Sequence, residues 1–326
     1  MRNKILELLR ANTSTYLSGE EIASQLGVSR TAIWKHMQEL KNAGYEIASH
    51  ARKGYQLIAA PDRLLADTIG NGLNTKLIGS AFVCFDNVKS TNDEAKALAR
   101  KGAVNGTVVV SEAQSVGKGR MERSFFCPEG GIWFSVILRP DFLPMEAPKC
   151  TLLAAVAVTK AMRKQGLEAG IKWPNDIICQ GKKLTGILTE MSAEMDKINY
   201  VVIGTGINVN IPAASFPEEL QDKASSMSAL LGHDVPKIAF FQDVLRNMEK
   251  LYLEIEANGF KELLQQWRHY SITLGQEINV IGVKETFSGI ARDIDDDGAL
   301  LVETQQGLRK VLAGDVSIRP RNKQVK

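Results

Sequence analysis

The stretch Glu112-Ala-Gln-Ser-Val-Gly-Lys-Gly-Arg-Met-Glu-Arg123 is a basic loop that is broken by two glycines. It lies between the β-branched run Thr-Val-Val-Val at 107–110 and the apolar run Ile-Trp-Phe-Ser-Val-Ile-Leu at 132–138, and both runs are typical of buried strands. Gly117 and Gly119 are expected to adopt positive φ and to let the backbone approach a ligand closely. Three cations that suit a phosphate or carboxylate follow, namely Lys118, Arg120 and Arg123. The loop predicts a site for an anionic small molecule, although an ordinary solvated loop has the same composition.

Composition favours a folded protein of two or three domains, since the chain has 326 residues and a hydrophobic fraction of 44%. No apolar stretch approaches the roughly 20 residues of a membrane span, and the first residues lack the apolar segment of a signal peptide. We therefore expect a cytoplasmic protein with no membrane association. Four widely spaced cysteines without a CxxC pair favour reduced, mostly structural thiols over a zinc site or a disulfide framework, namely Cys84, Cys127, Cys150 and Cys179.

The positive charge of the chain is concentrated at its N-terminus. Residues 1–60 hold eight Lys or Arg and five Asp or Glu, so this segment alone accounts for the net charge of +3. An excess of basic residues favours an anionic partner for this segment.

The same 60 residues predict a winged helix-turn-helix. Apolar side chains recur at helical spacing in three segments, Ser18-Gly-Glu-Glu21 is a capping box for the second helix, and Gly27 ends it. Ser29 can cap the third helix, whose buried stripe is expected to contain Ile33 and Met37. The alternating segment 45–57 then reads as a hairpin with Arg52-Lys53-Gly54 at its tip.

Operator DNA is the expected partner of this domain. The candidate DNA-binding residues share the outer face of the third helix and the wing: Ser29, Arg30, Thr31, Trp34, Lys35, Gln38, Arg52 and Lys53. The alternative is a protein-interaction domain with a solvated basic face. Because operators are usually bound by dimers, the rest of the chain is expected to form a homodimer interface.

Residues 61–271 are predicted to form a mixed α/β domain. Ser90-Thr91-Asn92 opens a helix whose first turn offers free N–H groups and hydroxyls, with Ser90 as its N-cap, although a well-capped helix alone explains the pattern. Trp-Pro-Asn-Asp at 173–176 interrupts two strand-like pieces. In the returning strand, alternation places Lys183 and Thr185 on one face and Gly186 on the other.

Five ordered motifs carry a family resemblance: STN at 90–92, GKGR at 117–120, KWPND at 172–176, GKKLTGIL at 181–188 and GTGINVN at 204–210. In order and spacing they resemble the biotin protein ligases. Together with the N-terminal domain, they resemble the bifunctional bacterial type that also represses biotin synthesis and uptake genes. One departure is that the family's usual GRGRRGR loop is GKGRMER here, so that Lys118 keeps the charge without the bidentate guanidinium.

The resemblance implies a fold, a reaction and partners. It implies an α+β chain with a central domain related to class II synthetases and, over residues 272–326, a small SH3-like β-barrel. It further implies that ATP, Mg²⁺ and biotin form biotinyl-5'-AMP, which then transfers biotin to a lysine of a biotin carboxyl carrier protein. Biotinyl-AMP would also act as the corepressor and drive homodimer formation.

Site residues follow from the same motifs, position by position. The resemblance implies catalytic roles for Lys183, Arg120 and Asp176. It implies biotin contacts from Ser90, Thr91, Asn92, Gln114, Lys118, Gly119, Arg120, Lys183, Gly186 and Gly204. It implies nucleotide contacts from Lys118, Arg120, Arg123, Trp133, Lys172, Asn175, Asn208 and Arg319.

Three other functions are compatible with parts of the sequence. A lipoate ligase shares the chemistry, but its usual Gly-Gly-Gly and His-Asp signature is absent where this chain has QSVGKGR. A metabolite-sensing transcription factor without ligase activity would not need Lys183 or Asp176. A class II aminoacyl-tRNA synthetase is disfavoured because no segment resembles an anticodon-binding domain.

Overall fold

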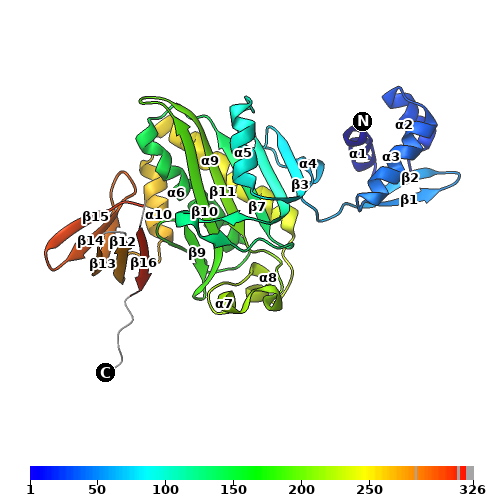
Figure 1. The fold of residues 1–326 in the computed structure, drawn as a ribbon. Helices are drawn as coiled ribbons and strands as arrows, with labels where there is room; N and C mark the ends of the chain where they lie inside the picture. The colour runs from blue at the N-terminus through cyan, green and yellow to red at the C-terminus, as the bar shows by residue number, and fades with distance from the viewer. Residues whose placement is uncertain (283–284, 314–315, 321–326) are drawn as a thin grey trace. The chain divides into compact units, whose positions relative to one another are not determined.

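The computed structural model describes residues 1–282, 285–313 and 316–320, so the end of the expected C-terminal domain, 321–326, lies outside the described residues. The chain separates into two compact units, Met1–Asn71 and Gly72–Lys326 (Figure 1). The division lies beyond the boundary expected between residues 60 and 61. It does so because Asp67 accepts hydrogen bonds from the Tyr45 hydroxyl and, over 3.4 Å, from the Arg10 guanidinium, which ties the segment after residue 60 to the N-terminal unit.

The N-terminal unit has the winged arrangement that the sequence predicts. Its elements are α1 (Arg2–Ala11), α2 (Gly19–Leu26), α3 (Arg30–Asn42), β1 (Glu46–His50), β2 (Gly54–Ala59) and α4 (Ala66–Gly70). The capping box is present, because Glu21 N–H donates to Ser18 Oγ over 3.1 Å and Ser18 N–H donates to Glu21 Oε2 over 2.7 Å. Gly27 ends α2 at φ 65°. Ile33 and Met37 are buried, so the predicted stripe of α3 faces the core.

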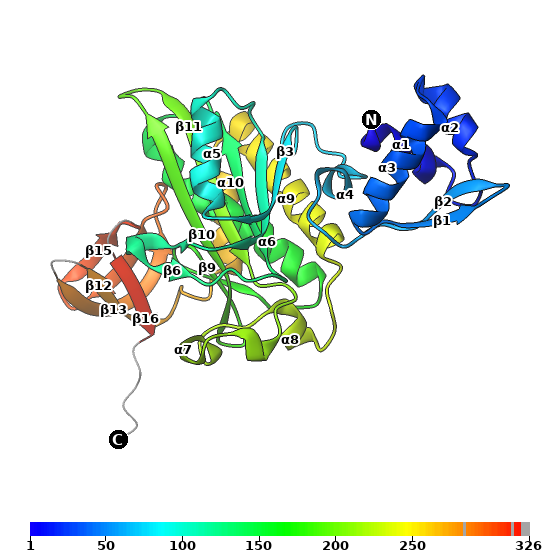
Figure 2. The same ribbon diagram turned by 45° about the vertical axis from the view of Figure 1, so that its right-hand side comes forward.

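A seven-stranded sheet forms the centre of the second unit (Figure 2). Its strand order is β3-β4-β7-β11-β10-β9-β8. Its strands are β3 (Phe82–Val88), β4 (Val108–Gln114), β7 (Ile132–Leu138), β8 (Gly170–Lys172), β9 (Asp176–Cys179), β10 (Lys182–Ala193) and β11 (Ile198–Ile207). Only β3 and β4 pair in parallel; the remaining neighbours of this sheet are antiparallel. β7 is buried along its whole length, as expected for a central strand that is covered on both faces.

Helices cover both faces of this sheet (Figure 1). Helix α5 (Thr91–Arg100) packs on β4, β7 and β11, whereas α6 (Cys150–Lys164) packs on β8 to β11 from the other face, with α9 (Lys237–Asn258) and α10 (Lys261–Tyr270) beside it. The segment before α6 is a 3-10 turn over Pro144–Lys149, because Pro148 lacks an N–H for an α-helical bond. Gly259 ends α9 and separates it from α10.

Shorter elements complete the second unit. They are β5 (Gly117–Lys118) and β6 (Ser124–Phe125), which pair with each other, the 3-10 turns Arg120–Glu122 and Ala213–Ser215, and the short helices α7 (Glu218–Gln221) and α8 (Met227–Leu231). The C-terminal segment forms a five-stranded antiparallel sheet in the order β15-β14-β13-β12-β16. Its strands are β12 (Glu277–Gly282), β13 (Thr286–Ile294), β14 (Leu300–Thr304), β15 (Gly307–Val311) and β16 (Val316–Pro320).

Candidate functional site

A cavity of about 580 Å³ lies in the second unit and gathers all five sequence motifs. It is lined by the N-terminus of α5, the basic loop, the turn between β8 and β9, and the middle of β10 and β11. Among the described residues, seven Lys or Arg and two Asp contribute to its wall, so the cavity suits an anionic ligand.

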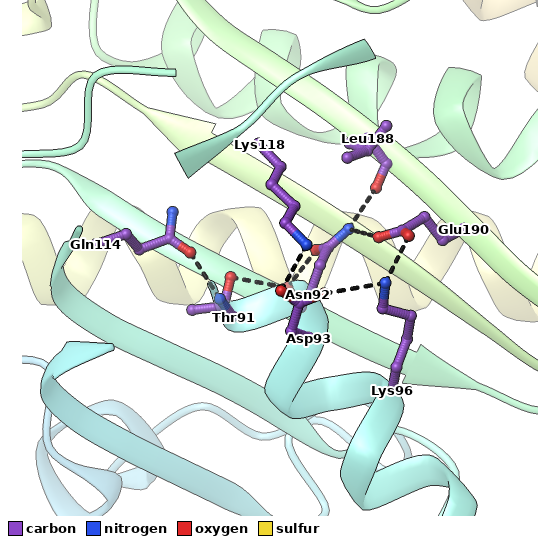
Figure 3. Close-up of polar contacts among 9 residues, drawn as sticks. Thr91, Asn92, Asp93, Lys96, Gln114, Lys118, Leu188 and Glu190 are labelled. Atoms are coloured by element: carbon purple, nitrogen blue, oxygen red, sulfur yellow. Dashed lines mark hydrogen bonds and ion pairs between the residues drawn. The ribbon is translucent and has the colours of Figure 1, made fainter. Parts of the chain in front are cut away.

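The N-terminus of α5 forms the polar end of the cavity (Figure 3). Ser90 occupies the N-cap position, but the expected cap bond is absent; instead Gln114 Oε1 accepts from Thr91 N–H over 2.6 Å. Ser90 is 97% buried and lines the cavity. Its hydroxyl makes no capping hydrogen bond to the helix. The carboxamide of Asn92 bridges two strands, because the Ser135 hydroxyl donates to its oxygen over 2.6 Å and its nitrogen donates to Glu190 Oε2 over 2.8 Å.

Glycines in β11 give this end its shape. A Cβ at Gly204 would lie 1.9 Å from Asn92 Oδ1, and one at Gly206 would lie 2.9 Å from the Phe125 ring. Both contacts are shorter than side chains tolerate, so the two glycines let Asn92 and Phe125 pack directly against the β11 backbone, which forms the floor of the cavity.

The basic loop forms the second wall, but its glycines do not behave as expected. Gly119 has φ −113° and Gly117 is not in the positive-φ region; the left-handed residue is Met121, at φ 56°. The glycines are needed for close packing instead, since a Cβ at Gly117 would lie 2.2 Å from the Phe125 carbonyl oxygen. The prediction of positive φ at Gly117 and Gly119 was therefore wrong, and the close approach of this backbone to a ligand stays a prediction.

Two cations of this loop already have protein partners. Lys118 Nζ lies 2.6 Å from Asp93 Oδ2 in the first turn of α5 (Figure 3). The Arg120 guanidinium donates to Asn175 Oδ1 over 3.3 Å and to the carbonyl oxygen of Ala313 in the C-terminal segment. The loop thus contacts both ends of the cavity.

Lys183 and Asp176 form an ion pair in the cavity wall, with Nζ 2.5 Å from Oδ1. The expectation that Lys183 shares a face with Thr185 was wrong. Lys183 pairs with Ile178 but Thr185 pairs with Ile177, so β10 carries an extra residue at this point and the alternation is interrupted. Lys183 therefore lies on the cavity side together with Gly186, while Thr185 is fully buried on the other face.

Lys172 adds a partly buried cation to the same wall. Burial lowers the pKa of its amine below the usual value; Asp176 opposes this effect, and the charges of Lys183 and Arg319 reinforce it. Burial also raises the pKa of the nearby Cys127 thiol to about 12, so Cys127 is an uncharged thiol and not a nucleophile at neutral pH.

Fifteen of the seventeen predicted ligand and catalytic residues line the cavity; the exceptions are Trp133 and Asn208. The indole N–H of Trp133 donates to the carbonyl oxygens of Glu112 and Pro128, over 3.1 and 2.9 Å, and the ring packs edge-on against Phe125. The Asn208 amide nitrogen donates to Ser225 O over 2.9 Å, behind Lys183. In this structure both residues support the wall from behind.

Sequence reasoning missed several residues of the wall. They are Phe125, Pro174, Ile187, Leu188, Gly206, Asp222 and Lys223 among others. Phe125 follows the basic loop and lies over the glycine floor, with the Lys183 amine 5.3 Å from its ring centre. An aromatic residue directly after a cationic loop was the signal that could have found it.

A second, mainly apolar cavity of about 660 Å³ shares a wall with the first. The common residues are Arg120, Met121, Pro174, Asn175, Ile187 and Leu188. Beyond them it is lined by the 3-10 turn at Pro144–Lys149, by β10 and by the turn before β14, with exposed Met145 and Met191 at its edge.

The candidate DNA-binding residues lie on the N-terminal unit. Ser29 caps α3 by accepting from Ala32 N–H over 3.2 Å, and Trp34 exposes 57% of its surface, which is unusual for so large an aromatic side chain. The other members of the set are exposed, except that Gln38 is half-buried: Arg30, Thr31, Lys35, Arg52 and Lys53.

Comparison with known proteins agrees with this geometry. Residues 84–208 match the Biotin/lipoate A/B protein ligase family, residues 1–56 match an HTH domain, and residues 273–319 match the biotin protein ligase C-terminal domain. The chain is 42% identical to the bifunctional ligase/repressor BirA of Bacillus spizizenii over 320 residues, which cover 98% of both chains. The chain belongs to the biotin protein ligase family.

Two further proteins that this chain resembles are a second bifunctional ligase/repressor and a biotin protein ligase of known structure. The chain is 30% identical to the bifunctional ligase/repressor BirA of Escherichia coli over 324 residues, which cover 98% of both chains. The biotin protein ligase from Aquifex aeolicus, solved in complex with biotin and ATP, aligns with a TM-score of 0.65 at 27% identity. That alignment covers 74% of this chain and 100% of the Aquifex chain.

Within residues 1–282, 285–313 and 316–320, no three His, Cys, Asp or Glu side chains come together as ligands for a metal ion. None of the helices in these ranges is long and apolar enough to cross a bilayer.

Proposed function

We propose that this chain activates biotin with ATP and transfers it to a lysine of a biotin carboxyl carrier protein. The observation that carries the proposal is the cavity itself, which places a hydroxyl- and amide-lined end at α5 next to a wall of cations. A neutral ring system fits the first part, and a carboxylate with a triphosphate fits the second.

Activation joins two anions, so cations must offset their repulsion. A carboxylate oxygen of biotin attacks the α-phosphorus of ATP, the bond to the β-phosphate breaks, and pyrophosphate leaves. Lys183 lines the cavity and would stabilise the charge that develops on the carboxylate and phosphate oxygens. Arg120 and the Lys118-Gly119 backbone would close over the same groups, while Lys172, Arg123 and Arg319 would contact the nucleotide phosphates.

Transfer needs an uncharged lysine amine. The amine attacks the acyl carbon of biotinyl-5'-AMP, an amide bond forms, and AMP leaves with the electron pair of the broken acyl–oxygen bond. Asp176, paired with Lys183 at 2.5 Å, would orient the incoming amine and accept its proton. The loop closed by Arg120 would exclude water, which otherwise hydrolyses the acyl-adenylate.

Mg²⁺ would accompany the nucleotide in this scheme. Asp176 and Asp222 are the carboxylates in the described cavity wall, too few for a cage built from protein ligands alone. Mg²⁺ commonly binds through substrate phosphates and one or two carboxylates, which fits this donor set, and it would neutralise phosphate charge.

The acceptor would approach across the second cavity. Because that cavity shares Arg120, Asn175 and Leu188 with the first, a lysine that enters the reaction site brings its neighbouring residues over the apolar wall. The apolar wall would then contact those neighbours and contribute to recognition of the carrier protein.

We further propose that the chain represses biotin genes when it holds biotinyl-5'-AMP. Exposed Trp34 and the basic residues of α3 and the wing provide a DNA-binding face. Bound adenylate would order the basic loop, favour a homodimer and so place two such faces on a palindromic operator.

The test is to incubate the purified protein with ATP, Mg²⁺ and biotin, or with lipoate in place of biotin, and to follow pyrophosphate release. Tightly held biotinyl-5'-AMP that transfers to a carrier-domain lysine would support the proposal. Turnover with lipoate alone would indicate a lipoate-type ligase, and absence of turnover with either acid would indicate a metabolite sensor.

A further inference from the structure

Trp173 makes two hydrogen bonds from the turn between β8 and β9 to the C-terminal segment. Its backbone N–H donates to Thr273 Oγ1 over 2.9 Å, and its indole N–H donates to the carbonyl oxygen of Gly298 over 3.2 Å. Thr273 precedes β12, and Gly298 lies in the turn between β13 and β14. Trp173 is 99% buried, so water does not replace either partner.

The Gly298 acceptor is itself held in place. Lys149, 95% buried, donates to the neighbouring Asp296 carbonyl oxygen over 2.8 Å and lies 4.3 Å from the centre of the Phe260 ring. Gly298 has φ +77°, and a Cβ there would lie 2.8 Å from Leu152 Cδ1. The turn therefore packs directly on α6 and presents a fixed carbonyl group to the indole.

The other side of the Trp173 turn is fixed by β10. Asn175 Nδ2 donates to Ile187 O over 2.8 Å, and Ile187 N–H donates to Asn175 O over 3.1 Å. Asp176 then pairs with Gly186 in the sheet and with Lys183 through its side chain. The turn that carries Asp176 is thus held between β10 and the C-terminal segment.

We propose that Trp173 is a positioning residue, whose two hydrogen bonds to the C-terminal segment set Asp176 against Lys183 in the reaction cavity. The inference rests on the proposed ligase function and adds a role for the C-terminal segment in its geometry. It predicts an effect confined to one end of the cavity. The polar end is built from α5 and β4, through Thr91 and Gln114, and the described part of the chain shows no hydrogen bond between it and Trp173.

Trp173→Phe tests the proposal because it keeps an aromatic ring and removes the indole N–H. We expect kcat for adenylate formation and for transfer to fall about tenfold, as the loss of one buried hydrogen bond predicts, with the KM for biotin unchanged. Thr273→Val, which removes the other acceptor, should do the same. Thr273→Ser keeps the hydroxyl and should restore kcat.

Trp267→Phe is the matched control. Trp267 is fully buried in α10, and its indole N–H has no hydrogen-bond partner among the described residues. The substitution therefore removes a similar volume and no hydrogen bond, and kcat should stay within about twofold of the parent chain. If Trp267→Phe lowered kcat as much as Trp173→Phe, or if the KM for biotin rose in step with the fall in kcat, the positioning role would be excluded.

Amide hydrogen exchange makes the test independent of turnover. Trp173→Phe should accelerate exchange in segment 172–178 and leave the first turn of α5 unchanged, and Trp267→Phe should accelerate neither. Unchanged exchange in 172–178 would overturn the inference even in an active enzyme. A parent chain that releases no pyrophosphate with biotin would instead count against the ligase function, while the exchange comparison would still decide the role of Trp173.

Discussion

Lys118 Nζ lies 2.6 Å from Asp93 Oδ2, so the basic loop is tied to the first turn of α5 (Figure 3). Burial favours the protonated form of Asp93, but hydrogen bonds from Lys118 and Lys96 outweigh it and hold the pKa of this carboxyl below its usual range. The contact is therefore present at neutral pH and is lost as the pH falls through that lowered pKa. In this arrangement Asp93 is paired with the Lys118 amine, which could otherwise bind a ligand carboxylate or phosphate.

Asp93→Asn should free Lys118 for the ligand. Because the pair is about 40% exposed, the gain is limited to ~1 kcal/mol, and we expect the acyl-adenylate to dissociate up to about fivefold more slowly. The dissociation rate of labelled biotinyl-5'-AMP measures it. Glu303→Gln, which removes an exposed ion pair with Arg292 in the C-terminal sheet, is the control and should change nothing. Faster dissociation from Asp93→Asn would mean that Asp93 organises the loop for binding.

The lowered pKa of Lys172 predicts that the affinity for ATP falls as the pH rises into the alkaline range. Since burial lowers this pKa, the amine loses its charge at a lower pH than an exposed lysine, and affinity for ATP should fall there. In Lys172→Arg the cation persists, so the KM for ATP should stay level to higher pH. Measuring KM for ATP from pH 7 to 10 checks this; identical profiles for both proteins would show that Lys172 does not contact the phosphates.

The motifs could be predicted from sequence because each is a short local pattern, but the orientation of single side chains could not. Lys183 reaches the cavity through an interruption of β10 that strict alternation does not anticipate. Trp133 lies in β7, which is buried on both faces and pairs with β4 and β11. Only the hydrogen bond from its indole N–H to the Glu112 carbonyl oxygen shows that the side chain supports the start of the basic loop. Partnerships between distant segments, such as Asn92 with Glu190, leave no local signal at all.

Substitutions at the ion pair should separate the two half-reactions. Lys183→Met removes the cation at the reacting carboxylate, and we expect adenylate formation to slow by about 10²- to 10³-fold, as for loss of one group that stabilises transition-state charge. Asp176→Asn keeps the side-chain volume and should slow transfer more than activation. Single-turnover assays with ATP and biotin, then with preformed adenylate and carrier domain, measure each step. Equal losses in both steps for Asp176→Asn would remove its role toward the amine.

The second cavity predicts a defect that is restricted to the acceptor. Met191→Asp and Met145→Asp introduce charge at its apolar edge, and each should raise the KM for the carrier domain about tenfold, as burial of an unpaired polar group predicts. Adenylate formation should be unchanged. Met195→Asp is the control, because Met195 is fully exposed outside the cavity. If the carrier KM were unchanged but adenylate-dependent dimerisation in the ultracentrifuge were lost, the cavity would belong to the homodimer interface.

Removal of the N-terminal unit should separate repression from ligation. Because Asp67 ties the segment after residue 60 to Tyr45 and Arg10, the cut belongs at Gly72, not at residue 61. Residues 72–326 should keep ligase activity and lose DNA binding. In the full chain, Arg52→Ala with Lys53→Ala should lower the salt dependence of binding to a 30-base-pair duplex by up to about two units of log K per log salt, because two phosphate contacts are lost. Lys41→Ala is the control, since that amine is bound to Ser49 over 2.8 Å. An unchanged slope in the double variant would place the wing away from the phosphates and favour a protein partner for this unit.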